Sequence, residues 1–147
     1  MRTLHATTAG RAAPGLRGTI AVVLRWKGSD VPRIVVRRLR RHDPVPPVYR
    51  ALLLALWEAR RMGARALVLG TDDADVAAQL TGGGSPPPEA IGPYLQIRAL
   101  LHAFRSVEVR CVTPGGDRDA ATAAAVAEHP GQPVYTDLPL WACAAAS

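Results

Sequence analysis

The side chains best placed for chemistry in this sequence are aspartates that follow a short apolar run. Ala66 to Leu69 is apolar and ends in Gly70, which is long enough for one buried strand and too short for a helix. Asp72 and Asp73 come directly afterwards. Open α/β sheets place their chemistry at the carboxyl ends of strands. Asp72 is therefore the first candidate for a functional residue.

Two helices are predicted on either side of this strand, and together the three elements must position Asp72. Leu52, Leu56 and Ala59 recur at three and four residues within the segment 47–62, so they share one helix face. Gly63 supplies the left-handed residue that ends this first helix. Asp73 is well placed to cap a second helix over residues 74–80.

The segment 47–82 resembles the middle of a type 1 ribonuclease H domain of the reverse-transcriptase-like subfamily. That family has a helix that starts glutamate-tyrosine-x-alanine-leucine, then a strand, then aspartate-serine-x-x-valine-x-x-glutamine-leucine-x-glycine. The matching stretches here are Tyr49-Arg50-Ala51-Leu52 and Asp72-Asp73-Ala74-Asp75-Val76-Ala77-Ala78-Gln79-Leu80-Thr81-Gly82. Spacing and most residue types agree.

Periodicity and turn residues elsewhere agree with the fold that this resemblance implies. Strands are expected over 2–8, 19–26, 33–40, 66–70 and 107–112, and further helices over 91–104 and 117–128. We therefore expect an α/β, ribonuclease H-like domain over residues 1–128. Its mixed five-stranded sheet should have three antiparallel strands followed by alternating helices and strands. The apolar tail, residues 129–147, is expected to dock on the domain or on a protein partner.

The resemblance also implies where a metal site would lie. Active members of the family hold two Mg²⁺ ions with four carboxylates, and Mg²⁺ prefers such oxygen ligands. Aligned on the family motifs, Asp72 is the one carboxylate retained. Thr7, Val48 and Ala121 occupy the other three positions. We therefore expect Mg²⁺ as cofactor only if the chain is active, and we expect most hydrolytic activity to be lost.

Other acids could in principle replace the missing ligands. Asp117 lies one helical turn before Ala121 and is a weak candidate metal ligand beside Asp72. The ordinary interpretation is that Asp117 caps the last helix, as Asp73 caps an earlier one. Two alternatives thus stay open: an active Mg²⁺-dependent ribonuclease for RNA–DNA hybrids with rearranged carboxylates, and a non-catalytic protein-interaction scaffold.

Charge is distributed unevenly along the chain and favours a polyanionic partner. Residues 1–50 contain 11 Lys and Arg against two aspartates, whereas the remaining residues contain 7 against 10 acids. The alternative is a solvated basic surface with no partner. Nucleic acid, as RNA–DNA hybrid or RNA, is the partner that we expect. The candidate contact residues are Arg25, Trp26, Lys27, Arg37, Arg38, Arg40 and Arg41.

Composition sets the remaining limits. The 147 residues suit one domain with an ordinary core, and the net charge is +6. No apolar run approaches the roughly 20 residues of a membrane span, and the amino terminus shows no signal pattern. Cys111 and Cys143 have no metal-binding spacing, so they are expected to be buried thiols. These features predict a cytoplasmic protein that does not enter membranes.

Overall fold

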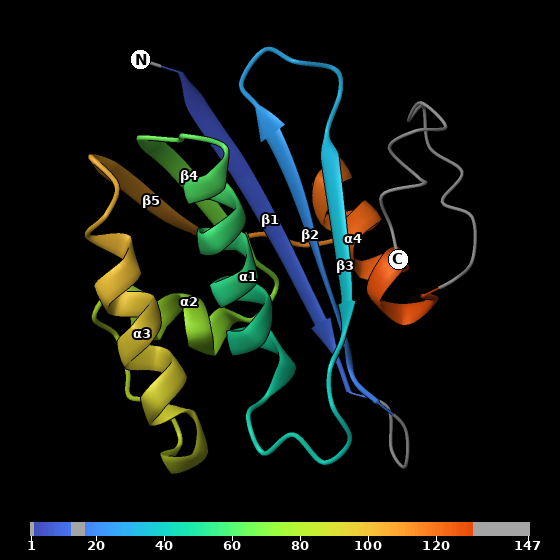
Figure 1. Ribbon diagram of the computed structural model, residues 1–147, viewed down its shortest axis with the longest axis vertical. Coiled ribbons are helices and arrows are strands. Elements are labelled where there is room, and N and C mark those ends of the chain that lie inside the picture. The colour runs from blue at the N-terminus through green and yellow to red at the C-terminus, as the bar shows by residue number, and fades with distance from the viewer. Residues whose placement is uncertain (1, 13–16, 131–147) are drawn as a thin grey trace.

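A five-stranded mixed sheet forms the centre of the protein, as seen in a computed structural model that describes residues 2–12 and 17–130 (Figure 1). The strands are β1 (Thr3–Arg11), β2 (Thr19–Trp26), β3 (Arg33–Arg38), β4 (Ala66–Thr71) and β5 (Ser106–Cys111). They lie in the order β3-β2-β1-β4-β5. β1 pairs antiparallel with β2, and β2 with β3, whereas β4 is parallel to β1 and β5 to β4. The predicted fold class and strand directions are confirmed.

Helices cover both faces of this sheet. They are α1 (Pro47–Arg61), α2 (Ala74–Leu80), α3 (Ile91–Leu101) and α4 (Arg118–Glu128), and a 3₁₀ turn, η1 (Pro88–Ala90), precedes α3. Figure 1 shows α1 and α3 on one side of the sheet and α4 on the other. We call these sides the α1 face and the α4 face. α4 packs against β1, β2 and β3, so it covers only one half of its face.

Alternation along the strands gives each face its own core. On the α1 face, large side chains of β1, β2 and β4 pack on the apolar stripe of α1, and Leu4, Leu24, Leu52, Leu56 and Leu67 are almost completely buried. On the α4 face, small residues of α4 pack on β1, β2 and β3; this core contains Ala9, Ala21, Val23, Ile34, Val36, Ala123, Val126 and Ala127. Alanines let the helix approach the sheet closely.

The predicted helix ends are confirmed by their capping geometry. Gly63, just after α1, has φ of 76°, a left-handed conformation that glycine adopts at little cost. Asp73 accepts a hydrogen bond from the Val76 N–H at 3.0 Å, and Asp117 accepts one from the Ala120 N–H at 2.9 Å. Both aspartates therefore satisfy backbone donors at helix starts.

Element lengths differ from expectation where pairing between strands decides them. β1 runs on to Arg11 instead of ending at Thr8, because it pairs with β2 up to Thr19. β3 ends at Arg38, because β2 offers it no residue beyond Thr19. The helix expected over 91–104 ends at Leu101. Its start at Ile91 is as predicted, and only its C-terminal end differs.

Some residues lie in an environment other than the predicted one, and others fall outside the residues that the structure describes. Cys111 is exposed, so the expectation that it is buried was wrong; it is the last residue of the outer strand β5. Cys143 and most of the tail expected to dock on a partner lie outside the described residues, which end at 130. Among the helices that are described, none has the length and apolar character needed to span a membrane.

Candidate functional site

Asp72 lies where the carboxyl ends of β1 and β4 meet. It directly follows the last residue of β4, Thr71, which is in register with Thr8 of β1. Thr8 also donates a side-chain hydrogen bond to the Gly70 carbonyl at 2.9 Å, which ties the two strands together at this point. The last residues of β1, up to Arg11, therefore run beside Asp72.

Arg11 binds Asp72 directly. Its Nη2 donates to Asp72 Oδ2 at 2.8 Å, and its Nε donates to Glu128 Oε1 at 3.2 Å. Nη1 donates to the Gly10 carbonyl at 2.9 Å. All three guanidinium nitrogens are thus engaged, and Arg11 links the end of β4 to the last turn of α4.

These bonds hold Arg11 as a partly buried cation at the end of β1. Partial burial works against the charge of Arg11, but hydrogen bonds to Asp72 and Glu128 outweigh it and raise the pKa of Arg11. The side chains of Arg11 and Asp72 are 31% and 21% exposed, so water screens the pair only in part. Such charge-assisted bonds are the stronger kind of hydrogen bond. The carboxylate that the sequence predicts as a metal ligand is therefore paired with a cation of the chain itself.

The three residues that the sequence analysis aligned with the other family carboxylates lie on separate elements. Thr7 is buried on the α4 face of β1, in register with Gly70. Val48 is half-buried in the first turn of α1. The start of α1 lies against β1, because a Cβ on Gly10 would be 2.8 Å from the Val48 nitrogen. Ala121 is exposed on α4. None of these three side chains can bind Mg²⁺ as a carboxylate does.

Asp117, the acid predicted as a possible substitute ligand, and two further aspartates that begin helices or lie in their first turns have other partners. The Asp117 carboxylate caps α4 and Asp73 caps α2. Asp119 is paired with Arg25. Within residues 2–12 and 17–130, no group of three or more His, Cys, Asp or Glu could hold a metal ion. The residues present do not fit the two-Mg²⁺ site that the family fold implies, because one retained carboxylate paired with an arginine cannot balance two divalent cations.

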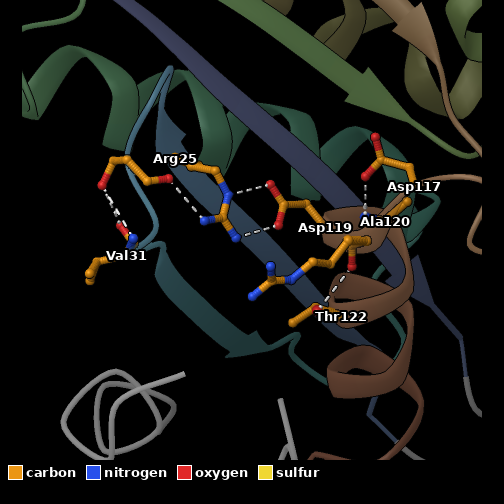
Figure 2. Close-up of polar contacts among 8 residues, drawn as sticks. Arg25, Val31, Asp117, Asp119, Ala120 and Thr122 are labelled. Atoms are coloured by element: carbon orange, nitrogen blue, oxygen red, sulfur yellow. Dashed lines mark hydrogen bonds and ion pairs between the residues drawn. The ribbon is translucent and has the colours of Figure 1, made fainter. Parts of the chain in front are cut away.

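Arg25, one of the predicted nucleic-acid contacts, is held inside the fold. Its Nε and Nη2 donate to the two carboxylate oxygens of Asp119 at 3.0 and 2.9 Å, and Figure 2 shows the parallel pair. Its Nη1 donates to the Ser29 carbonyl at 3.1 Å. The hydrogen bond to Asp119 raises the pKa of Arg25 despite partial burial. Arg25 therefore fastens the β2–β3 turn to α4 and has no free donor fork to offer a ligand.

The remaining predicted contacts fall into two groups at opposite ends of β3. Trp26 and Lys27 lie at the end of β2, near Arg33 in the register, since Leu24 pairs with Arg33. The second group is exposed at or beyond the other end of β3 and consists of Arg37, Arg38, Arg40 and Arg41. Arg38 lies five residues after Arg33 along the strand, a distance of about 16 Å. The structure therefore does not bring the predicted set into one patch.

The second group shares its end of the sheet with Asp72. Thr19 of β2 is in register with Arg38 of β3 on one side and with Arg11 of β1 on the other. Arg38 therefore lies in the same row of the sheet as Arg11, the residue that binds Asp72. Arg37 and Arg38 point to opposite faces, as alternation predicts. Arg40 and Arg41 follow the end of β3, so the strand alternation predicted for them does not apply.

Sequence reasoning missed Arg11 and Glu128. Arg11 fell within a predicted connection, and Glu128 lies 117 residues away at the end of a helix. One feature of the sequence could have indicated Arg11. His5, Thr7, Ala9 and Arg11 occupy alternate positions, so they lie on one face of the sheet if the first strand continues to Arg11.

Comparisons with known proteins agree with the fold described above. The family model described as "Reverse transcriptase-like" matches residues 13–127. A search of curated proteins found no match. Among solved structures, ribonuclease H1 from the halophilic archaeon Halobacterium salinarum is similar at a TM-score of 0.69 and 22% identity, over 86% of this chain and 97% of that one.

Two other solved structures show the same fold. The N-terminal ribonuclease H domain of a Mycobacterium tuberculosis protein, solved as a fusion with maltose-binding protein, has a TM-score of 0.63 and 20% identity, over 82% of this chain and 98% of that one. LC11 ribonuclease H1, isolated from compost by a metagenomic approach, was solved in complex with an RNA/DNA hybrid. It has a TM-score of 0.60 and 15% identity, over 82% of this chain and 90% of that one. At these identities the likeness establishes the fold.

Proposed function

Because this chain belongs to the reverse transcriptase-like family, we propose that it is a nucleic-acid-binding domain that has lost most of its hydrolytic activity. Its ligand is an RNA–DNA hybrid or another structured nucleic acid. The observation that carries the proposal is the 2.8 Å bond between Arg11 and Asp72. It neutralises the one retained carboxylate at the place where the family reaction needs metal ions.

Loss of hydrolysis follows from charge and ligand count. A Mg²⁺ ion at Asp72 would have to displace the Arg11 guanidinium or lie beside it, and two cations repel each other at such distances. It would also find neutral side chains, those of Thr7, Val48 and Ala121, in place of three carboxylates. Each 1.36 kcal/mol of lost transition-state stabilisation is a tenfold loss in rate. Several missing ligands together remove most of the activity.

Binding can survive without the metal site. LC11 ribonuclease H1, which has the same fold, was solved with an RNA/DNA hybrid. In this chain the exposed residues Arg38, Arg40 and Arg41 lie at the Asp72 end of the sheet. Guanidinium forks match phosphate oxygens and keep their charge at every physiological pH. These arginines supply a surface for the nucleic-acid backbone beside the inactive site.

Titration of a labelled, blunt-ended RNA–DNA hybrid over a range of salt concentrations tests the binding. The wild type should bind with affinity that falls steeply as salt rises. The triple variant R38A/R40A/R41A should bind more weakly and with a smaller salt slope, by about 0.7 to 0.9 for each phosphate that the variant no longer neutralises.

The matched control for this titration is E108A/R110A. It removes an exposed ion pair of β5 without changing the net charge, so its hybrid affinity should equal that of the wild type. A salt slope that is the same in the triple variant and the wild type would remove these arginines from the proposal. No hybrid binding by the wild type would favour the protein-interaction scaffold instead.

A further inference from the structure

A second basic surface lies at the opposite end of the sheet from Asp72. At this end, the top in Figure 1, β1 begins, the β2–β3 turn closes and α1 ends. Besides Arg2, which lies over the Trp26 ring, six exposed basic side chains come from these segments and from those that precede β4 and β5: Lys27, Arg33, Arg60, Arg61, Arg65 and Arg105. Together with Trp57 they form what we call the Trp57 surface.

Backbone contacts hold these segments together. Lys27 donates its N–H to the Thr3 carbonyl at 2.8 Å, and Thr3 is in register with Ala66. Arg65, just before Ala66, accepts a hydrogen bond at its carbonyl from the Arg105 N–H at 2.8 Å. Basic residues far apart in the sequence are thus placed side by side by the starts of three strands.

One buried carboxylate fixes two more arginines at the edge of this surface. Glu58 of α1 is 4% exposed, and its oxygens lie 3.0 Å from Arg33 Nη2 and 3.5 Å from Arg61 Nη1. The two arginines remain 47% and 73% exposed. Because one acid is shared by two cations, a net positive charge faces the solvent.

An exposed aromatic ring lies beside Arg60 on α1. Trp57 of α1 is 52% exposed, and the Arg60 guanidinium carbon lies 5.6 Å from the centre of its ring. A second tryptophan, Trp26, is half-buried beneath Arg2 at 4.6 Å. Exposed rings beside arginines are the combination on which unpaired bases stack while their phosphates are bound.

The ligand that fits both features is a single strand of nucleic acid. The same segments contain only two described acids. Asp30 is exposed, and Glu58 is buried under Arg33 and Arg61. Five of the six cations are arginines, whose planar forks bind phosphate oxygens bidentately. We infer that the Trp57 surface binds unpaired nucleic acid, with one base stacked on Trp57. The inference goes beyond the proposed function because it concerns a different end of the sheet and another form of nucleic acid.

Binding of a labelled 12-nucleotide single strand to the full chain tests this inference. W57A should weaken binding by about fivefold to a hundredfold, the usual loss for one stacked base. W57F keeps a ring and should lose much less. Removal of another exposed apolar side chain, in L95A on α3, is the control and should change nothing.

A pair of charge variants tests the phosphate contacts. R65A/R105A and R38A/R40A remove the same charge from opposite ends of the sheet. R65A/R105A should lower the salt slope for the single strand by about 1.4, at roughly 0.7 per neutralised phosphate. R38A/R40A should leave it nearly unchanged and should instead weaken the blunt hybrid.

The outcomes separate the two proposals. Single-strand binding that is insensitive to W57A, or equally weakened by both charge variants, overturns the Trp57 surface. Binding of anionic vesicles but not of single strands overturns it in favour of a lipid ligand. If single strands bind through Trp57 while the hybrid does not bind at all, this inference stands and the proposed hybrid binding fails.

Discussion

Arg11 and Asp72 lie 61 residues apart in the sequence, and Arg11 Nη2 is 2.8 Å from Asp72 Oδ2. The pair joins the carboxyl ends of β1 and β4, and through Glu128 it also holds the end of α4. Metal-binding members of this fold use cations from solution to balance their carboxylates. Here a side chain of the protein supplies the cation.

R11M should lower the free energy of unfolding by about 1–2 kcal/mol, because it leaves the partly buried Asp72 without its cation. Urea unfolding measures this loss. In a double-mutant cycle, D72N should recover part of it, since the carboxylate that lost its partner is then neutral. R110M, which breaks an exposed pair with Glu108, is the control and should have little effect. Equal effects of R11M and R110M would mean that the Arg11 bridge has no special role.

G10A should destabilise the protein by about 1–3 kcal/mol through overpacking. A Cβ at this position would lie 2.7 Å from the Pro47 carbonyl carbon, so the start of α1 would have to move away from β1. G115A is the matched control, because a Cβ there meets no atom within 4 Å. Thermal unfolding of the two variants compares them. An unchanged G10A would show that α1 does not lie this close to β1.

The chain should lose stability at acid pH in part because Asp43 becomes protonated. Burial works to raise the pKa of Asp43, but hydrogen bonds from Arg50 and the Val45 N–H outweigh it and lower the pKa below its usual 3.8. A carboxyl with a lowered folded pKa stabilises the fold above its unfolded pKa and loses that contribution as the pH falls through the folded pKa. D43N should therefore be less stable than the wild type near neutral pH, and the difference should shrink below a pH of about 3.8.

Urea unfolding at several pH values measures that difference. D30N, which removes an exposed aspartate, serves as the control and should follow the wild type throughout. A gap between D43N and the wild type that persists at acid pH would contradict the assignment to the Asp43 charge.

Local signals predicted much of this structure because local chemistry decides it. Asp73 and Asp117 cap their helices through bonds to residues three positions away, and Gly63 ends α1 by its own backbone conformation. Each of these capping features is encoded within a few residues of where it acts. The order of strands is not local, and it was implied by the family resemblance that rests on the motifs around Tyr49 and Asp72.

Partners of charged side chains could not be predicted in the same way. Arg25 looks like a surface residue in its strand, yet Asp119, 94 residues later, binds it bidentately. Arg11 lies in a segment rich in glycine and alanine, and only its pairing with β2 shows that it belongs to β1. Such contacts depend on how distant elements pack. They decide which arginines remain free for a ligand, which explains why the predicted basic patch divides into separate groups.

The most direct measurement is cleavage of a labelled RNA–DNA hybrid by the purified wild type and by D72N, with Mg²⁺ and with Mn²⁺. Binding to the same hybrid is recorded in the same samples. Because Arg11 is paired with Asp72, the carboxylate that the proposal places in the metal site, we expect both proteins to bind the hybrid and neither to cut it at a measurable rate. Metal-dependent cleavage by the wild type that disappears in D72N would contradict the proposed loss of activity.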